Sequence, residues 1–486
     1  MQIFIVLAIP ILLAIYALVD NSAKRIGITN ALGYALMLFF SVTLFADRHI
    51  GTSHISFFDF IYLDALSVFF IFVISIIAFA AALYSISYIC SDLQSALITQ
   101  KKAKLYYLFF NLFCFSMFLV PSVNNLGMMW VAIEMTTLIS AFLVGFYNTK
   151  LSVEAAWKYI VICSLGIIFA LLGTILFSYA YSVLGESKSL NWTELYFAAT
   201  RLDKNIIKVA FIFIMVGYGT KAGLAPMHTW LPDAHSQAVS PASALLSGVL
   251  LKTALYGILR FSIILNKSVG PEFVSHLFIL FGMMSIAVAA GFVLVQKDLK
   301  RLLAYSSIEH IGIISVGLGL GGVFGLFGAL MHIFNHAAAK AMMFFGAGNI
   351  VKAYKEHNMN SIRGVAKIMP FTGVMTLIGL FALSGFPPLA IFLSEISIAI
   401  AAFSHASYIL GIVFLALLAI VFSAMIRDFS KMIFGNVPSG MKKVHEPFGV
   451  KSAMLLLFLQ IALFSFFLPW IFKDNFWAAI KLLQGA

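Results

Sequence analysis

The sequence predicts an all-α membrane protein with about fourteen transmembrane helices, arranged as two inverted five-helix repeats with a broken helix in each half. Three observations predict this class. Hydrophobic residues make up 62% of the chain and charged residues only 10%, whereas soluble proteins are about 25% charged. Apolar runs of roughly 17 residues or more recur along the whole length. Two of these runs are interrupted by glycine and proline.

The predicted helices follow the apolar runs in order. We place them near residues 3–20, 28–46, 62–90, 105–121, 124–147, 155–183, 206–225, 240–265, 273–295, 302–320, 322–350, 370–402, 405–426 and 452–472. The seventh run is broken at Gly223 and Pro226, and the twelfth carries Gly385-Phe386-Pro387-Pro388 at its centre. Corresponding breaks in two halves are typical of inverted-repeat transporters. We therefore expect N-terminal helices in 1–104, a first repeat in 105–268, a second repeat in 269–430, and a C-terminal helix and tail in 431–486.

Basic residues are shared unevenly between the two sides of the predicted bundle. Most of the 31 lysines and arginines fall in loops that follow odd-numbered spans. Because basic loops stay in the cytoplasm, we predict a multi-pass protein of the inner (cytoplasmic) membrane with both termini outside. The start Met1-Gln2-Ile3-Phe4 lacks a basic segment, so the first span is expected to remain a membrane helix. The net charge of +12 then reflects orientation, and nucleic acid is not an expected partner.

The sequence offers no signal for a bound cofactor. Cys90, Cys114 and Cys163 lie in apolar surroundings without pairing or metal-ligand spacing, which is typical of buried packing residues. The chain has no phosphate loop, dinucleotide fingerprint or Cys-x-x-Cys motif. We expect this chain to bind neither a cofactor nor a metal, so that any redox centre belongs to a partner.

Ionisable residues lie inside or at the break of apolar spans: Glu134, Lys221, Lys252, Lys340 and Glu395. A charged side chain at the bilayer centre costs roughly 2.5–3.5 kcal/mol on insertion scales. A chain carries several such groups only when they pair, face a hydrated interior and serve a function. The row therefore predicts a path for protons or another cation.

The span near 322–350 gives the clearest motif. His332, His336 and Lys340 are spaced four residues apart, which stacks them on one helical face. Histidine exchanges protons near neutral pH. Polar residues that only join helices by hydrogen bonds are the alternative, but three on one stripe favour proton transfer.

Two further predictions concern the breaks. Glu134 lies in the middle of its span, and Lys221, beside the first break, is its expected partner. A carboxylate–ammonium pair with a variable spacing is a switchable proton site, and a static salt bridge is the alternative. Lys252 is expected near the middle of the membrane, about 12 residues into its span. Glu395 follows the second break.

Other polar residues are candidates for proton uptake: Glu309, His310, His228, Asp233 and His235. The first two stand about two turns past the basic pair Lys300-Arg301, where an interfacial polar cap is the alternative. The other three follow the first break. Asp64, at the start of the third span, is expected to be structural.

Long motifs resemble the antiporter-like subunits of respiratory complex I, a family that includes subunits of multisubunit sodium/proton antiporters and of group 4 [NiFe] hydrogenases. The motifs are the run from Gly219 to His235, Leu251-Lys252-Thr253, and the run from Leu299 to Ile308. The resemblance covers about residues 60–430. Ser307-Ile308-Glu309-His310 is most similar to the hydrogenase-4 component F branch.

The resemblance implies roles for matching residues. Glu134 resembles the fifth-helix glutamate and Lys221 its seventh-helix lysine partner. Lys252 and Lys340 resemble links of a central hydrophilic axis. Glu395 resembles the terminal residue of the broken twelfth helix, where some relatives have lysine.

The implied function is proton translocation by a non-catalytic subunit of a hydrogenase-4-type complex. Protons would pass along Lys252, His336 or His332, Lys340 and Glu395. Expected partners are other membrane subunits, membrane lipids and a peripheral redox module with [NiFe] and iron–sulfur centres. The alternatives are a subunit of a sodium/proton antiporter, a subunit of a complex I-type NADH:quinone oxidoreductase, and an inert membrane anchor, against which the intramembrane charges argue.

Overall fold

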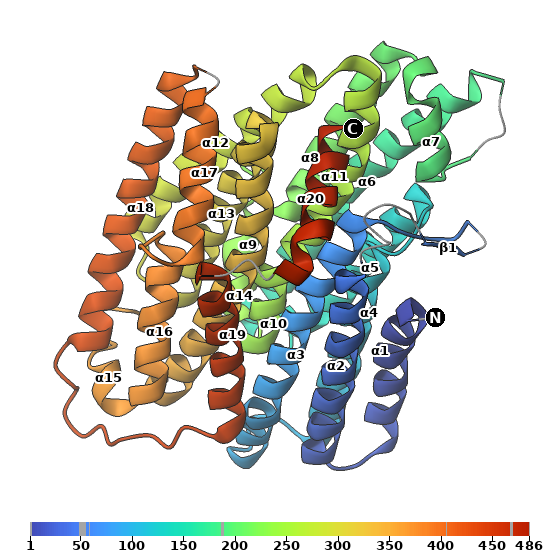
Figure 1. Cartoon of the computed structure of the whole chain (residues 1–486). Coiled ribbons are helices and arrows are strands. Elements are labelled where there is room, and N and C mark those ends of the chain that lie inside the picture. The colour runs from blue at the N-terminus through green and yellow to red at the C-terminus, as the bar shows by residue number, and fades with distance from the viewer. Residues whose placement is uncertain are drawn as a thin grey trace.

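The computed structural model is a slab of roughly parallel and antiparallel helices, with the N-terminal helices toward one end and the helices of residues 365–434 toward the other (Figure 1). The C-terminal helices, residues 448–466 and 470–484, return to the middle and pack against the helix of residues 65–94. The structure describes residues 2–47, 55–57, 59–185, 189–404, 406–466 and 470–485. The elements of the first half are α1 (Gln2–Val19), α2 (Ala23–Ala46), the antiparallel pair β1 (Ile55–Phe57) and β2 (Ile61–Leu63), α3 (Ala65–Gln94), α4 (Gln100–Leu119), α5 (Leu126–Val144), α6 (Lys150–Ser182), α7 (Trp192–Ala198), η1 (Ala199–Arg201), α8 (Lys204–Ala222), α9 (Trp230–Gln237), α10 (Ser240–Leu245), η2 (Leu246–Leu250) and α11 (Leu251–Val269).

The second half contains the other broken helix, and it ends with a helix that was not predicted from the sequence. Its elements are α12 (Glu272–Val295), α13 (Leu299–Leu320), α14 (Gly322–Tyr354), α15 (Val365–Ile368), α16 (Pro370–Leu383), α17 (Ala390–Ser404), α18 (Tyr408–Phe434), α19 (Phe448–Phe466) and α20 (Trp470–Gln484).

The predicted all-α membrane class is confirmed. In the described part of the chain, twelve helices are long and apolar enough to cross a membrane by length and composition. The shorter apolar helices α16 and α17 divide the predicted span 370–402 between them. Helix α4 matches the predicted span 105–121 but begins five residues earlier, among three lysines. The total of fourteen stays a prediction. The predicted span 452–472 contains residues 467–469, which lie outside the described residues.

Both predicted breaks are present. Helix α8 ends at Ala222, and Gly223 follows with φ +81°, a left-handed conformation that glycine adopts without strain. The Trp230 indole at the start of α9 donates to the Thr220 carbonyl, so a backbone group freed by the break has a partner. The second break separates α16 from α17, with Gly385 at φ +61°.

Helices in the middle of the slab hold the buried polar residues. The most apolar stretches of Ser240–Val269 and Leu299–Leu320 are fully buried within the chain, and that of α14 is largely so, whereas only a minor part of α18 is buried. The exposed faces of α6 and α18 are rich in leucine, isoleucine and phenylalanine. The fold therefore places apolar faces toward lipid and keeps the ionisable groups inside.

Two features were not anticipated from the sequence. The segment after 470 forms α20, which packs Phe476, Ala479 and Ile480 against the bundle. Their helical spacing was a readable signal. The predicted single span 240–265 contains a π-helical segment, Leu246–Leu250. Such π-bulges occur frequently at functional sites, and this one lies directly before Lys252.

Candidate functional site

Lys252 and His336 form the centre of the buried site. The Lys252 ammonium lies 2.7 Å from His336 Nδ1 and donates to the Ser247 carbonyl at 2.8 Å. That carbonyl belongs to the π-helical segment, whose backbone hydrogen bonds depart from the regular α-helical pattern. The segment also carries the Ser247 hydroxyl, which lies 2.7 Å from Ser307 Oγ on α13. Lys252 therefore links α11 to α14, as expected for a residue of a central axis.

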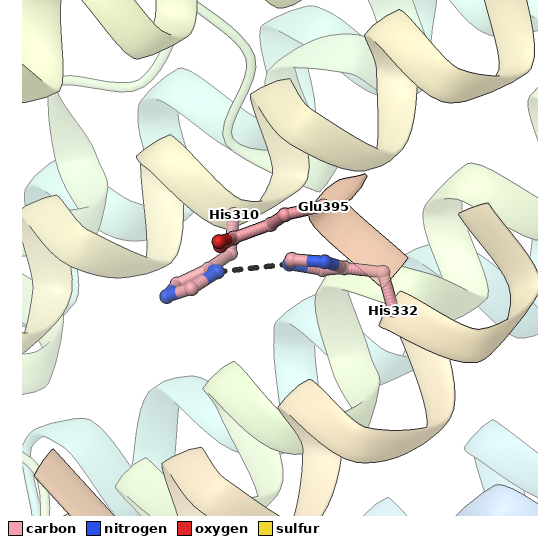
Figure 2. Close-up of side chains that lie close together, drawn as sticks. All are labelled: His310, His332 and Glu395. Carbon is pink, nitrogen blue, oxygen red and sulfur yellow. Dashed lines mark hydrogen bonds between the residues drawn. The ribbon is translucent and has the colours of Figure 1, made fainter. Parts of the chain in front are cut away.

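A second group of contacts joins α13, α14 and α17. His310 Nδ1 lies 2.9 Å from His332 Nε2 (Figure 2). His332 Nδ1 lies 2.9 Å from Ser394 Oγ. The His310 ring also lies 4.5 Å from the His336 ring, centroid to centroid. Although the sequence suggested proton uptake at His310 near a helix end, the structure places this residue deep inside, between the two histidines of α14.

The hydrogen bonds in this group have a direction. Ser394 Oγ donates its hydrogen to the Ile391 carbonyl, so it accepts from His332 Nδ1–H. A neutral His332 then has a lone pair on Nε2, which accepts from His310 Nδ1–H. The series donates from His310 to His332 to Ser394.

His310, His332 and Glu395 also have the ligand types of a zinc site. The relevant atoms of these three residues lie within 4.8 Å of one another, and Figure 2 shows the three side chains together. However, His310 Nδ1 and His332 Nε2 share a hydrogen bond, and His332 Nδ1 is bonded to Ser394. Since a metal ligand needs a free lone pair aimed at the ion, we interpret the group as a hydrogen-bonded junction.

Glu395 and Glu309 border a small cavity of about 20 Å³ together with Ser306 and Ser384. A space of this size holds about one water molecule. Glu309 is buried at the inner part of α13 rather than at a helix end. Gly385 lies against Glu395, and a Cβ at this glycine would collide with the Glu395 carboxylate.

Lys340 has a different position from the two histidines of its stripe. The His332 and His336 rings stack at 6.0 Å, as the four-residue spacing predicted. The Lys340 ammonium instead donates to the Leu303 carbonyl on α13 at 2.9 Å. The expected order, with Lys340 between the histidines and Glu395, therefore does not follow the hydrogen bonds, which pass through His310 and Ser394.

Glu134 and Lys221 are joined through a hydroxyl group. Lys221 Nζ donates to Thr137 Oγ1, which donates to Glu134 Oε2 at 3.1 Å. Lys221 also donates to Tyr159 Oη at 2.9 Å, and Glu134 accepts from Ser164 Oγ at 2.7 Å. Lys221 is fully buried and Glu134 is half-buried. Sequence reasoning missed these three hydroxyl residues. Thr137 lies one turn after Glu134, but nothing local pointed to the two residues of α6.

The remaining candidates near the first break separate into two kinds. Asp233 accepts from Lys158 at 3.2 Å and from Arg301 at 2.8 Å, so it ties α6, α9 and α13 together near the surface. His228 and His235 are buried, and His228 Nδ1 and both ring nitrogens of His235 have no hydrogen-bond partner. Such orphaned groups indicate places where water is needed.

The fold and this polar axis together define a class of protein, the antiporter-like membrane subunits. A family model described as NADH:quinone oxidoreductase/Mrp antiporter, TM, matches residues 123–423, more than half of the chain. The chain belongs to this family.

Individual relatives agree with the resemblance to hydrogenase-4 component F. A Hydrogenase-4 component F homolog of Methylacidiphilum infernorum is 36% identical over 412 residues, which cover 84% of each chain. A Na(+)/H(+) antiporter subunit of Alkalihalophilus pseudofirmus is 27% identical over 377 residues, 76% of this chain and 73% of that one. A chain of the membrane-bound sulfane sulfur reductase, an archaeal respiratory membrane complex, superimposes with a TM-score of 0.86 at 22% identity over the full length of both. This last likeness shows the fold.

Proposed function

We propose that this chain translocates protons across the membrane as a non-catalytic subunit of a hydrogenase-4-type respiratory complex. The observation that carries the proposal is the hydrogen-bonded series of His310, His332 and Ser394. It lies beside Lys252 and His336 and ends one residue before Glu395. An inert anchor has no use for such a series, because each buried polar group opposes insertion.

The direction of the series sets the direction of transfer. A proton arriving at His310 Nε2 allows Nδ1 to release its own proton to His332 Nε2. His332 Nδ1 then releases a proton to Ser394 Oγ. The Ser394 hydroxyl turns away from the Ile391 carbonyl and passes its own proton to the Glu395 carboxylate, which takes it up. Transfer along these bonds therefore runs from α13 toward α17, the second broken helix.

The first half supplies a switchable charge. Lys221 donates to the hydroxyls of Thr137 and Tyr159, and Glu134 accepts from the same threonine hydroxyl. A conformational change that brings the ammonium directly to the carboxylate withdraws positive charge from the central axis. Coulomb energies are large in such a dry interior, so this movement alters the proton affinity of the axis.

We place the chain in an inner (cytoplasmic) membrane with the basic loops on the cytoplasmic side. The proposed partners are other membrane subunits, surrounding lipids and a peripheral module that holds [NiFe] and iron–sulfur centres, with none bound by this chain. Electron transfer in that module would drive the movement of Lys221. A sodium/proton antiporter component is the second candidate, because the antiporter relative from Alkalihalophilus pseudofirmus is similar over most of both chains.

Purified complex in sealed vesicles tests the proposal. We expect redox turnover to acidify one compartment, and expect Lys221→Ala and Glu134→Gln to abolish acidification while the complex assembles normally. The exposed His276→Gln on α12 serves as the matched control. Wild-type proton movement in both site variants would contradict the proposal. Sodium-dependent proton movement without a redox substrate would instead support the antiporter.

A further inference from the structure

A large cavity opens at the end of the bundle that carries the basic loops. It measures about 710 Å³ and lies between the ends of α3, α9, α13 and α14. Its lining includes Tyr88, Asp92, Tyr147, Ser236, Lys300 and Lys352. Asp92 is the one carboxylate among its lining residues, all of which the structure describes. At the rim, burial and the nearby Lys300 charge lower the pKa of His357, so this imidazole is neutral at neutral pH. The cavity is polar, roomy enough for many waters, and unexplained by the axis described above.

Asp92, on α3, is held by contacts from α14 and from the end of α5. Its carboxylate lies 2.6 Å from Lys352 Nζ on α14 and accepts from Tyr147 Oη, just after α5, at 2.8 Å. Lys352 also donates to the Tyr88 carbonyl at 2.8 Å and lies over the Tyr88 ring, 3.2 Å from its centroid. The Asp92 side chain is only 3% exposed. The acid is therefore at the cavity wall but is shielded by a lysine.

The short helix α9 carries both two lining residues of the cavity and the buried His235. Ser236 and Gln237 line the cavity and directly follow this histidine in α9. His235 is fully buried, neither ring nitrogen has a partner, and its ring stacks on Phe344 at 4.8 Å. Phe344 is one helical turn from Lys340 on α14. His235 thus belongs to a helix that borders the cavity, and its ring packs on α14 one turn from Lys340. Its two unpaired ring nitrogens indicate a place where water is needed.

Lys352 has a second carboxylate on its other side. It also lines a neighbouring cavity of about 200 Å³, together with Tyr88 and Glu446. The Glu446 carboxylate accepts from the backbone N–H groups of Phe371 and Thr372, at 3.0 and 2.6 Å. These groups begin α16, the first part of the second broken helix. Tyr88, Ser91 and Lys352 line both cavities, and each cavity also contains an acid.

Building on the proposed function, we infer that Asp92 is the proton-loading group of this cavity and that Lys352 is its positioning residue. A proton from cavity water adds to the Asp92 carboxylate, and the loss of its charge frees Lys352 to turn toward Glu446. The proton then passes through water to a ring nitrogen of His235, which regenerates the Asp92 carboxylate. No electron is transferred and no other bond changes.

A purely structural ion pair between α3 and α14 predicts different behaviour. Removing one partner of a buried pair leaves an unpaired charge, which destabilises the fold. Replacing both partners with uncharged groups changes the free energy of unfolding little. The double variant Asp92→Asn, Lys352→Met therefore distinguishes the two roles. We expect it to assemble but to lose proton translocation by at least tenfold. Translocation at the wild-type rate in this variant would overturn the inference.

The experiment uses the complete complex in vesicles, with Asp92→Glu and Asp428→Asn as control variants. Asp92→Glu keeps an ionisable carboxyl and is expected to retain at least half of the wild-type rate. Asp428 pairs with Arg427 away from the cavity, so its substitution is expected to change nothing. If Lys221→Ala stops translocation but Asp92→Asn does not, Asp92 is not the proton-loading group and the proposed function stands. If neither substitution reduces it, the proposed function fails as well.

Discussion

Lys221 and Glu134 do not contact each other directly; the hydroxyl of Thr137 lies between them, accepting from the lysine and donating to the glutamate. The two charges are thus held one hydroxyl apart in the buried first half of the chain. The sequence suggested a Glu134–Lys221 pair with a variable spacing, with a static salt bridge as the alternative. The bridged arrangement leaves a short movement by which the pair can close, so the contact is suited to switching rather than to permanent pairing.

Removing the bridging hydroxyl tests this arrangement. We expect Thr137→Val to reduce proton translocation by about tenfold, or about 1.4 kcal/mol, because Lys221 then keeps only the Tyr159 hydroxyl. Thr137→Ser retains the hydroxyl and is expected to keep most of the rate. Equal rates for the two variants would show that the hydroxyl is not used. The measurement is acidification by reconstituted vesicles, normalised to assembled complex.

His310 is expected to be essential because it connects His336 with His332. His310→Gln keeps a side chain of similar length but removes proton exchange, so we expect at least a tenfold loss of translocation with normal assembly. Asp233→Asn, which breaks only surface ion pairs, is the matched substitution among the predicted uptake residues. A stronger loss for Asp233→Asn than for His310→Gln would contradict the position assigned to the axis.

The close contact between Gly385 and Glu395 gives a test at the second break. An alanine at Gly385 would collide with the carboxylate and would have to adopt a positive φ, which costs roughly 1–3 kcal/mol. We expect Gly385→Ala to displace Glu395 and to reduce translocation to nearly the level of Glu395→Gln. Thermal unfolding of the purified complex separates this displacement from general loss of structure. Gly291→Ala, which meets open space, provides the control.

Arg260 and Asp64 are expected to matter for stability rather than for transport. Arg260 donates to both carboxylate oxygens, at 2.6 and 2.8 Å, and its guanidinium lies 4.7 Å from the Trp192 ring. Breaking one side of such a buried pair costs roughly 3–5 kcal/mol. We expect Arg260→Gln to lower the yield of assembled complex, while the complex that does assemble retains its rate per molecule. A fully assembled variant that does not translocate would show that the pair belongs to the proton path.

The membrane class, the helix positions and the two breaks were predictable because each is encoded locally. Apolar run length sets a span, and glycine with proline ends a helix wherever it occurs. The stripe of His332, His336 and Lys340 was predictable for the same reason, since helical spacing fixes which residues share a face. The helix α20 was overlooked although its apolar spacing was present.

The sequence by itself determined which ionisable residues lie within membrane-spanning stretches and on which helices they lie. Only the tertiary structure decided their partners: Thr137 between Lys221 and Glu134, His310 inside the axis, and Lys340 on a backbone carbonyl of α13. It also brought Asp92, Lys352 and Glu446, which are distant in the sequence, to adjoining cavities. The physical reason is that a hydrogen bond depends on an ångström-scale distance between atoms, and helix packing, not residue spacing along the chain, sets that distance.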